Sequence, residues 1–260
     1  MPTNYSEEAL RSLLLAMADD ELVLGHRDSE WTGHAPILEE DIAFSNIAQD
    51  EIGHSLVWYT LLQQLNGKTP DEMGFHRTWD RFTCCRFVAY PKGDFGYTVL
   101  RQYLFDEAEH VRLSALTESA YSPLRDASAK ILREEAYHLM HTKGLVERLG
   151  DATEESHSRM QLSADAAFPQ ALGMFEEIDG EKDLAGIIPP CSVLSARWLD
   201  RVVPVLISAS LHVPVQHNNG SITPLCMPDS GGRKGNHTAD LKQIVDDLQS
   251  VYRIAPGGKW

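Results

Sequence analysis

Residues 51–54 (EIGH) and residues 135–138 (EAYH) carry the same short motif, a glutamate followed three positions later by a histidine. Because residues three apart share one face of a helix, each motif places a carboxylate and an imidazole side by side. A single acidic residue precedes each copy at almost the same distance, Glu21 before the first and Asp106 before the second. Each copy therefore predicts one helix with a single carboxylate, a turn, and a second helix with Glu-x-x-His.

Two such helix pairs, folded as a four-helix bundle, direct four carboxylates and two imidazoles toward a common centre. That set of side chains binds two iron or two manganese ions in carboxylate-rich sites. Carboxylates are hard, anionic donors and imidazole suits both metals, so the sequence predicts two iron ions and leaves manganese possible. The predicted ligands are Glu21, Glu51, His54, Asp106, Glu135 and His138.

The carboxylate of the third predicted helix has alternatives. Asp106 is in phase with one set of apolar residues on this helix and Glu107 with another, so either can face the core. Asp106 preserves the spacing of the repeat better and is preferred. Glu107 remains the alternative, and Glu109 is a third option.

Glu-x-x-His alone is a weak signal, since about one match is expected by chance in a chain of this composition. Two further copies occur, at 107–110 and at 154–157. The last, Glu154/His157, lies in a polar stretch and is predicted to be solvent-exposed and inert. The copies at 51 and 135 instead continue the apolar stripes of their helices, where ionisable side chains are costly unless they are paired or bind cations.

Other acidic residues flank the predicted ligands. Asp50 and Glu134 each lie four residues before a motif histidine, and we predict that they accept the remaining imidazole N–H and fix the ring. The alternative for both is a solvated charge on a helix face. Asp19 and Asp20, next to Glu21, are predicted to be solvated.

Apolar spacing and turn residues divide the chain into helices and connections. The four bundle helices are predicted at about 6–28, 37–65, 94–120 and 122–150, with a long crossover at 66–93. Further helices are predicted at 155–178, 189–212 and 238–252, and strand signals are absent. Residues 213–236, rich in proline and glycine, are predicted to form an extended loop.

We therefore predict an all-α protein, a ferritin-like four-helix bundle with additional C-terminal helices. In this interpretation residues 1–260 form a single domain. Residues 1–150 are the metal-binding bundle, residues 151–212 are accessory helices, and residues 213–260 are an extended loop, a short helix and a tail.

The composition excludes some classes of function. The formal net charge of −15 argues against a nucleic-acid partner, because phosphate binding requires concentrated lysine and arginine. No apolar run reaches the length of a membrane span, and residues 1–9 are not a signal peptide. The cysteines have neither zinc-ligand nor disulfide-framework spacing, so we expect reduced thiols and a cytoplasmic protein. They are Cys84, Cys85, Cys191 and Cys226.

The chain also lacks a source of electrons. It contains no glycine-rich dinucleotide motif and no cysteine cluster for an iron–sulfur centre. Electrons for any oxygenase reaction must therefore come from another protein.

Several long segments resemble the phenylacetyl-CoA epoxidase family of bacterial phenylacetate degradation. The resemblance covers nearly the whole chain, and its tail is similar to that of the C subunits of the family. The segments are ELVLGHRDSEWTGHAPILEEDIAFSNIAQDEIGHSLVWY (21–59), RQYLFDEAEHVRL (101–113), SAKILREEAYHL (128–139), GLVERLG (144–150), GGRKGNHTADL (231–241) and PGGKW (256–260).

The resemblance implies a ferritin-like bundle that pairs with the homologous catalytic A subunit. In the family the A subunit performs the reaction, which adds an oxygen atom of O2 across the aromatic ring of phenylacetyl-CoA, and a reductase component supplies electrons from NADPH. The C subunit is commonly a structural companion whose ligands have degenerated. This sequence departs from that pattern, because all six predicted ligands match the ligand positions of the catalytic subunit.

The leading hypothesis is therefore a subunit of a multicomponent di-iron oxygenase that acts on phenylacetyl-CoA by ring 1,2-epoxidation. The alternatives are a non-catalytic structural subunit of that complex and a stand-alone ferritin-like iron oxidase.

Two further segments have open interpretations. An apolar group at Trp198, Leu199, Val202 and Val203 is either intramolecular core or, if exposed, a partner interface. The basic loop at 233–234 is either a solvated turn or a contact to a CoA phosphate or an acidic partner.

Overall fold

The computed structural model describes residues 5–218, 220–256 and 258. Within this part, the chain has the predicted all-α, ferritin-like class, with one short hairpin as the exception. It divides into two compact units, each built on a pair of long helices. The α1–α2 unit comprises Glu7–Pro91 and Gly231–Trp260, and the α5–α6 unit comprises Met1–Ser6 and Lys92–Ser230. The predicted single domain with boundaries at 150 and 212 stays a prediction.

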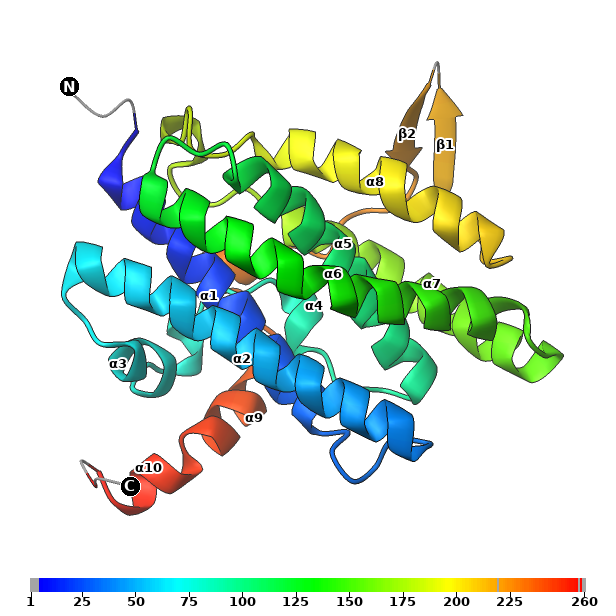
Figure 1. Cartoon of the computed structure of the whole chain (residues 1–260), viewed down its shortest axis with the longest axis horizontal. Helices are drawn as coiled ribbons and strands as arrows, with labels where there is room; N and C mark the ends of the chain where they lie inside the picture. The colour runs from blue at the N-terminus through cyan, green and yellow to red at the C-terminus, as the bar shows by residue number, and fades with distance from the viewer. Residues whose placement is uncertain (1–4, 219, 257, 259–260) are drawn as a thin grey trace. The chain divides into compact units, whose positions relative to one another are not determined.

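The α1–α2 unit is built on an antiparallel helix pair, α1 (Glu7–Ser29) and α2 (Leu38–Asn66), which run side by side in Figure 1. Their direction follows from the contacts, since Asp19 bonds to Tyr59 and Gly25 lies against Ala48. Helix α2 ends where the sequence predicts. Gly67 takes the left-handed conformation (φ 74°) and its N–H donates to the carbonyl of Gln63, which closes the last turn.

The crossover after α2 contains more structure than predicted. The sequence predicts a long connection here, and the structure shows that it holds α3 (Pro70–Phe75), the 3₁₀ turn η1 (Trp79–Arg81) and α4 (Arg86–Ala89). The C-terminal segment belongs to the same unit, where α9 packs against α1, α4 and η1. This segment consists of η4 (Gly232–Lys234), α9 (Ala239–Leu248) and α10 (Ser250–Ile254). Of the predicted tail, residues 257, 259 and 260 lie outside the described residues.

The α5–α6 unit is built on a second helix pair. Helix α5 (Phe95–Leu116) begins at Asp94, whose carboxylate accepts the N–H of Tyr97 as an N-cap. Helix α6 (Ser122–Asp151) starts with proline in its first turn, where the missing N–H costs nothing. Both starts agree with the sequence prediction.

Two more long helices complete this unit, and both contact α5 and α6. They are α7 (Glu154–Leu172) and α8 (Cys191–Ser208), with the 3₁₀ turns η2 (Gly173–Phe175) and η3 (Glu181–Asp183) between them. Because α5 lies among three other helices, most of its side chains are buried and none is fully exposed.

The apolar group on α8 is intramolecular core. Its four side chains are all buried, and the indole N–H of Trp198 donates to the carbonyl of Leu104 on α5 at 2.9 Å. Phe168 stacks against the same indole, and the ring of Phe175 contacts it in a tilted arrangement. This face of α8 is therefore not available to a partner.

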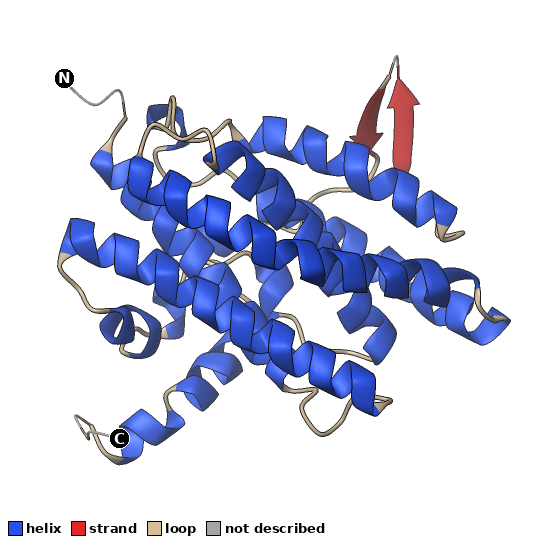
Figure 2. Ribbon diagram, in the orientation of Figure 1, coloured by secondary structure: helices blue, strands red, loops and turns tan. Residues whose placement is uncertain are grey.

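The prediction that strands are absent is wrong for part of the extended loop. Residues Val215–Asn218 (β1) and Ser221–Pro224 (β2) form an antiparallel hairpin, drawn in red in Figure 2. The dipeptide at 219–220 is Asn-Gly, a strong sequence signal for a two-residue hairpin turn, and it was the available clue.

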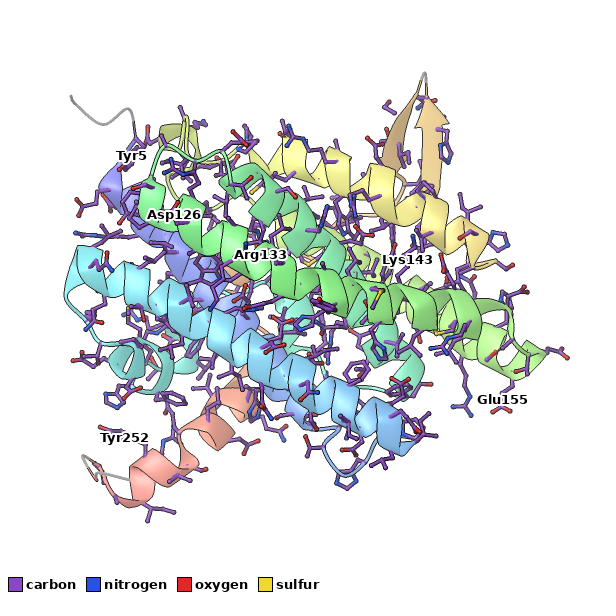
Figure 3. All side chains as sticks on the ribbon, in the orientation of Figure 1. Tyr5, Asp126, Arg133, Lys143, Glu155 and Tyr252 are labelled. Carbon is purple, nitrogen blue, oxygen red and sulfur yellow. The ribbon has the colours of Figure 1, made fainter. Side chains whose placement is uncertain are left out.

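The exposed face of α6 carries polar side chains together with the apolar Tyr137 and Met140. Asp126, Arg133 and Lys143 are labelled along this helix in Figure 3, and the first two are exposed. None of the helices in the described part of the chain combines the length and hydrophobicity that a bilayer span requires.

Candidate metal centre

Three of the predicted ligands gather within the α1–α2 unit. Glu21 on α1 and the pair Glu51 and His54 on α2 are all buried. Each offers one ligand atom, and these three atoms lie within 4.8 Å of one another. We call this group the first half-site.

A glycine allows the two helices to approach closely beside the first half-site. Gly25 lies one helical turn after Glu21, and therefore on the same side of α1. A Cβ at this position would lie 2.9 Å from Cγ1 of Ile52, 3.0 Å from the carbonyl oxygen of Ala48 and 3.1 Å from Cβ of Glu51. Only glycine permits this spacing, and sequence reasoning missed the residue because nothing local marks a helix contact.

Replacing Gly25 by valine should push α1 away from α2 at the first half-site. We expect overpacking to cost about 1–3 kcal/mol of the free energy of unfolding, measured by urea denaturation, together with weaker metal binding. The matched control is Gly53→Ala on α2, where a Cβ meets no atom within 4 Å. That control should be neutral or slightly stabilising, because alanine favours helix. Equal effects of the two substitutions would contradict the proposed contact.

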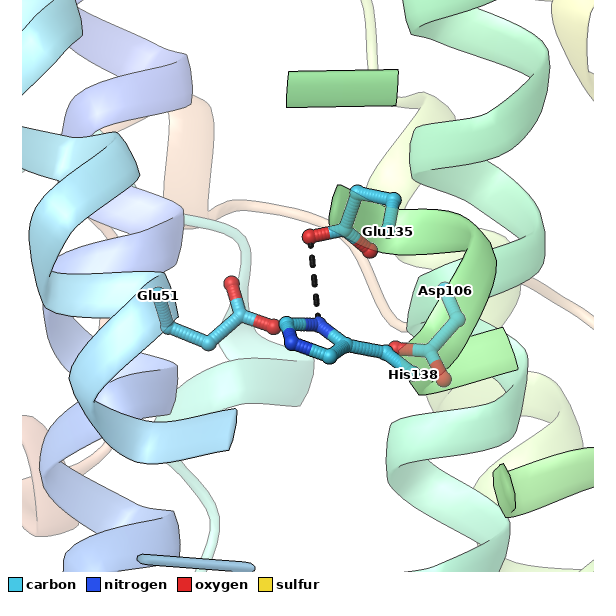
Figure 4. Close-up of side chains that lie close together, drawn as sticks. All are labelled: Glu51, Asp106, Glu135 and His138. Atoms are coloured by element: carbon cyan, nitrogen blue, oxygen red, sulfur yellow. Dashed lines mark ion pairs between the residues drawn. The ribbon is translucent and has the colours of Figure 1, made fainter. Parts of the chain in front are cut away.

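The other three predicted ligands gather within the α5–α6 unit. Asp106 on α5 and the pair Glu135 and His138 on α6 are buried, and each offers a ligand atom within 4.8 Å of those of the other two. Nδ1 of His138 lies 3.3 Å from Oε1 of Glu135, the interaction dashed in Figure 4. We call this group the second half-site.

Two neutral donors hold the carboxylate of Asp106. The hydroxyl of Thr142 donates to Oδ2 at 2.6 Å, and the side-chain amide of Gln102 donates to Oδ1 at 2.8 Å. Burial raises the pKa of Asp106 well above its ordinary value, and the negative charge of Glu135 raises it further; His138 and the two hydrogen bonds act in the opposite direction. Two carboxylates buried this close together favour a bound cation, since burying like charges without one is costly.

The alternatives to Asp106 are ion-paired elsewhere. Glu107 accepts a hydrogen bond from Nε of Arg201 on α8 at 2.5 Å, and Glu109 pairs with Arg112. Because an arginine already neutralises each of these carboxylates, Asp106 is the α5 carboxylate best suited to a metal.

The other flanking residues have different surroundings. Asp50 is exposed on α2, and Glu134 is half-exposed on α6 with its carboxylate 3.8 Å from Nζ of Lys130. The proposed role of both in fixing the histidine rings stays a prediction. In the fourth Glu-x-x-His, Glu154 is exposed as predicted, whereas His157 is half-buried and its Nδ1 bonds to the carbonyl of Gly150.

The prediction that Asp19 and Asp20 are solvated is wrong. Both are fully buried. Asp19 pairs with Arg77, and it accepts hydrogen bonds from the hydroxyl of Tyr59 at 2.5 Å and from the N–H of Thr83 at 2.7 Å. These partners come from α2 and the crossover, so local sequence could not reveal that this side of α1 is covered.

Asp20 is paired with Arg233, which overturns both interpretations of the basic loop for that residue, whereas Lys234 is exposed. Arg233 is buried, and its two terminal nitrogens donate to the two carboxylate oxygens of Asp20 at 2.7 and 2.6 Å. The residue is thus neither part of a solvated turn nor open to a CoA phosphate. It is an internal ion pair between the C-terminal segment and α1.

Comparison with known proteins shows the family to which the chain belongs. Residues 1–260 match the family model described as phenylacetic acid catabolic protein. The chain is 34% identical over 255 residues to the C subunit of 1,2-phenylacetyl-CoA epoxidase from Escherichia coli (strain K12), covering 96% of this chain and 99% of the relative. It is 25% identical over 202 residues to the A subunit of the same organism's enzyme, covering 76% of this chain and 62% of that relative. The chain belongs to the phenylacetic acid catabolic protein family.

Proposed function

We propose that this chain is a metal-binding subunit of a phenylacetyl-CoA epoxidase that holds two iron ions, with the carboxylates and the imidazole of each half-site as ligands. The observation that carries the proposal is that each helix pair gathers two carboxylates and one imidazole in its interior. A chance occurrence of Glu-x-x-His does not require a third ligand from the neighbouring helix, and here both copies have one.

The donor chemistry fits the proposed metals. Carboxylate oxygens and imidazole nitrogen suit iron and manganese, and each half-site supplies both kinds of donor. The candidate ligands of each half-site are also grouped with one another in the interior of their unit, as residues that share a cation are.

If iron were bound by the residues of the half-sites, it would supply the chemistry that activates dioxygen, and the protein would control access and orientation. Neighbouring residues hold the candidate ligand side chains in fixed orientations. Thr142 and Gln102 each occupy one lone pair on a different oxygen of Asp106, which fixes the carboxylate and leaves further lone pairs for a metal. The contact between Glu135 and His138 orients both side chains on the same face of α6.

The proposed protein partners are two, a reductase that delivers electrons from NADPH and a homologous A-type subunit. Similarity to both the C and A subunits of the E. coli enzyme supports the second partner. The proposed substrates are O2 and phenylacetyl-CoA.

A second candidate function is a non-catalytic structural subunit of the same complex. It is favoured by the higher identity and fuller coverage of the C subunit than of the A subunit. The two candidates differ in whether the ligands of this chain contribute to turnover.

Metal content tests the metal-binding proposal. Purified chain reconstituted anaerobically with ferrous iron should retain about two ions per chain after desalting, measured by elemental analysis. A chain that stays metal-free under conditions in which it is folded would end the metal proposal and leave the structural role.

Turnover separates the two candidates. The chain is mixed with an intact A subunit, the reductase, NADPH, O2 and phenylacetyl-CoA, and oxygenated product is measured. A Glu51→Ala variant that still assembles with the A subunit should lose product if this chain performs chemistry. Undiminished product with that variant assigns the chain a structural role.

The choice between Asp106 and Glu107 has its own test. Asp106→Asn removes a ligand charge and should weaken metal binding by at least the 10- to 100-fold that loss of an outer partner costs. Glu107→Gln should leave metal affinity nearly unchanged, because the carboxylate of Glu107 forms an ion pair with Arg201. Calorimetric titration with Mn²⁺ compares the two variants, and a reversed ranking would assign the ligand role to Glu107.

A further inference from the structure

The loop Gly231–Gly235 is shaped to insert one arginine into the interior of the α1–α2 unit. Gly231 has φ 123°, a conformation that favours glycine. A Cβ at Gly232 would lie 2.4 Å from the carbonyl oxygen of Cys84 and 2.9 Å from the backbone nitrogen of Arg86. The loop therefore presses its backbone against residues 84–86, which is possible only without side chains at these two positions.

Arg233 follows directly and is held by several acceptors. Besides the two hydrogen bonds to Asp20, its Nη1 donates to the carbonyl of Thr83 at 3.0 Å and to that of Ala16 on α1 at 3.4 Å. Asp20 in turn accepts the N–H of Cys85 at 2.7 Å. The ion pair thus joins α1, the crossover and the C-terminal segment at one point.

Glu21 of the first half-site directly follows Asp20 in α1. Successive residues of a helix are rotated by about 100°, so an anchor on Asp20 determines the direction of its neighbour. Asp19 is anchored separately, by Arg77 from the crossover. Two adjacent side chains anchored in different directions prevent α1 from rotating or sliding along its axis.

We propose that Arg233 is a positioning residue, whose ion pair with Asp20 sets the rotation of α1 and thereby directs Glu21 into the first half-site. The inference rests on the proposed function in treating Glu21 as a metal ligand. Stability alone does not account for the pair, because buried ion pairs are often no more stabilising than apolar residues of the same volume. The proposed effect of the pair on the direction of the adjacent Glu21 does account for it.

The experiment compares variants of the full chain by thermal unfolding and by two further readouts. Arg233→Gln removes the charge, and Arg233→Lys retains it with a single donor group. The double variant Asp20→Asn with Arg233→Gln removes both charges and leaves no uncompensated one. The matched control is Arg253→Gln, from the same C-terminal segment, whose ion pair with Asp246 is solvent-exposed.

The first readout is titration with Co²⁺, followed by the visible absorption that reports the coordination of the ion. Arg233→Gln should weaken Co²⁺ binding by about 10- to 100-fold, as loss of an outer partner does, and should alter the spectrum. Arg233→Lys should recover part of the affinity, and Arg253→Gln should match the unmodified chain. The double variant should regain thermal stability without regaining the Co²⁺ spectrum.

The second readout is hydrogen exchange of the metal-free chain. Amides of α1 around Glu21 should exchange faster in Arg233→Gln than in Arg253→Gln. If affinity and spectrum return together with stability in the double variant, the pair is merely structural and the inference is wrong. If the unmodified chain binds no Co²⁺, the proposed function fails, while the exchange comparison still decides whether Arg233 holds α1.

Discussion

Replacing His138 by alanine should lower the iron content of the reconstituted chain from about two ions to about one or fewer. His138 is the only nitrogen donor among the three residues of the second half-site, and its ring lies beside Glu135 in the interior of the α5–α6 unit. Without it, only carboxylates would remain to hold the ion. The affinity should fall by more than the 10- to 100-fold typical of an outer partner. Elemental analysis after anaerobic reconstitution measures the effect.

The matched control is His157→Ala, which removes the histidine of another Glu-x-x-His. His157 bonds to a backbone carbonyl and its motif glutamate is exposed, so iron content should stay at the level of the unmodified chain. Circular dichroism must show both variants folded. Full iron content in a folded His138→Ala variant would remove the second half-site from the proposal.

Replacing Trp198 by alanine should have the largest effect on stability, about 3–5 kcal/mol of the free energy of unfolding. The indole is fully buried between α5 and α7, and its removal leaves both a cavity and the carbonyl of Leu104 without its donor. Typical domains are stable by only about 5–15 kcal/mol. The substitution should therefore move the urea midpoint far toward zero denaturant.

Leu162→Ala on α7 is the control for this prediction. Its side chain is 68% exposed, so truncation should change the free energy of unfolding by less than about 0.5 kcal/mol. A comparable shift in the two variants would mean that Trp198 does not pack as described, and would reopen the interpretation of this α8 face as a partner surface.

Local patterns predicted the elements that local interactions determine. The starts of α5 and α6 followed from Asp94 and from proline at the first turn, and the end of α2 followed from Gly67. Each of these signals acts within one turn of the chain, through caps and allowed backbone angles. The hairpin at 215–224 was missed although its Asn-Gly signal was equally local.

The candidate ligands were also predicted from spacing, because a repeated Glu-x-x-His with one distant carboxylate constrains which helix faces must be buried. Within each unit the structure brings the predicted residues together. Their binding of metal remains the proposal that iron reconstitution tests.

By itself, the sequence determined the helical class, the helix pairs and the six candidate ligands, since periodicity and spacing express which faces of each helix meet. Only the tertiary structure decided which of the other acidic residues are buried and which arginine pairs with each of them. Asp20 is buried against Arg233 from the far end of the chain, and Glu107 is neutralised by Arg201 from α8. Such ion pairs form between segments that are distant in the sequence. The periodicity of one segment therefore cannot show which arginine will pair with which of its carboxylates.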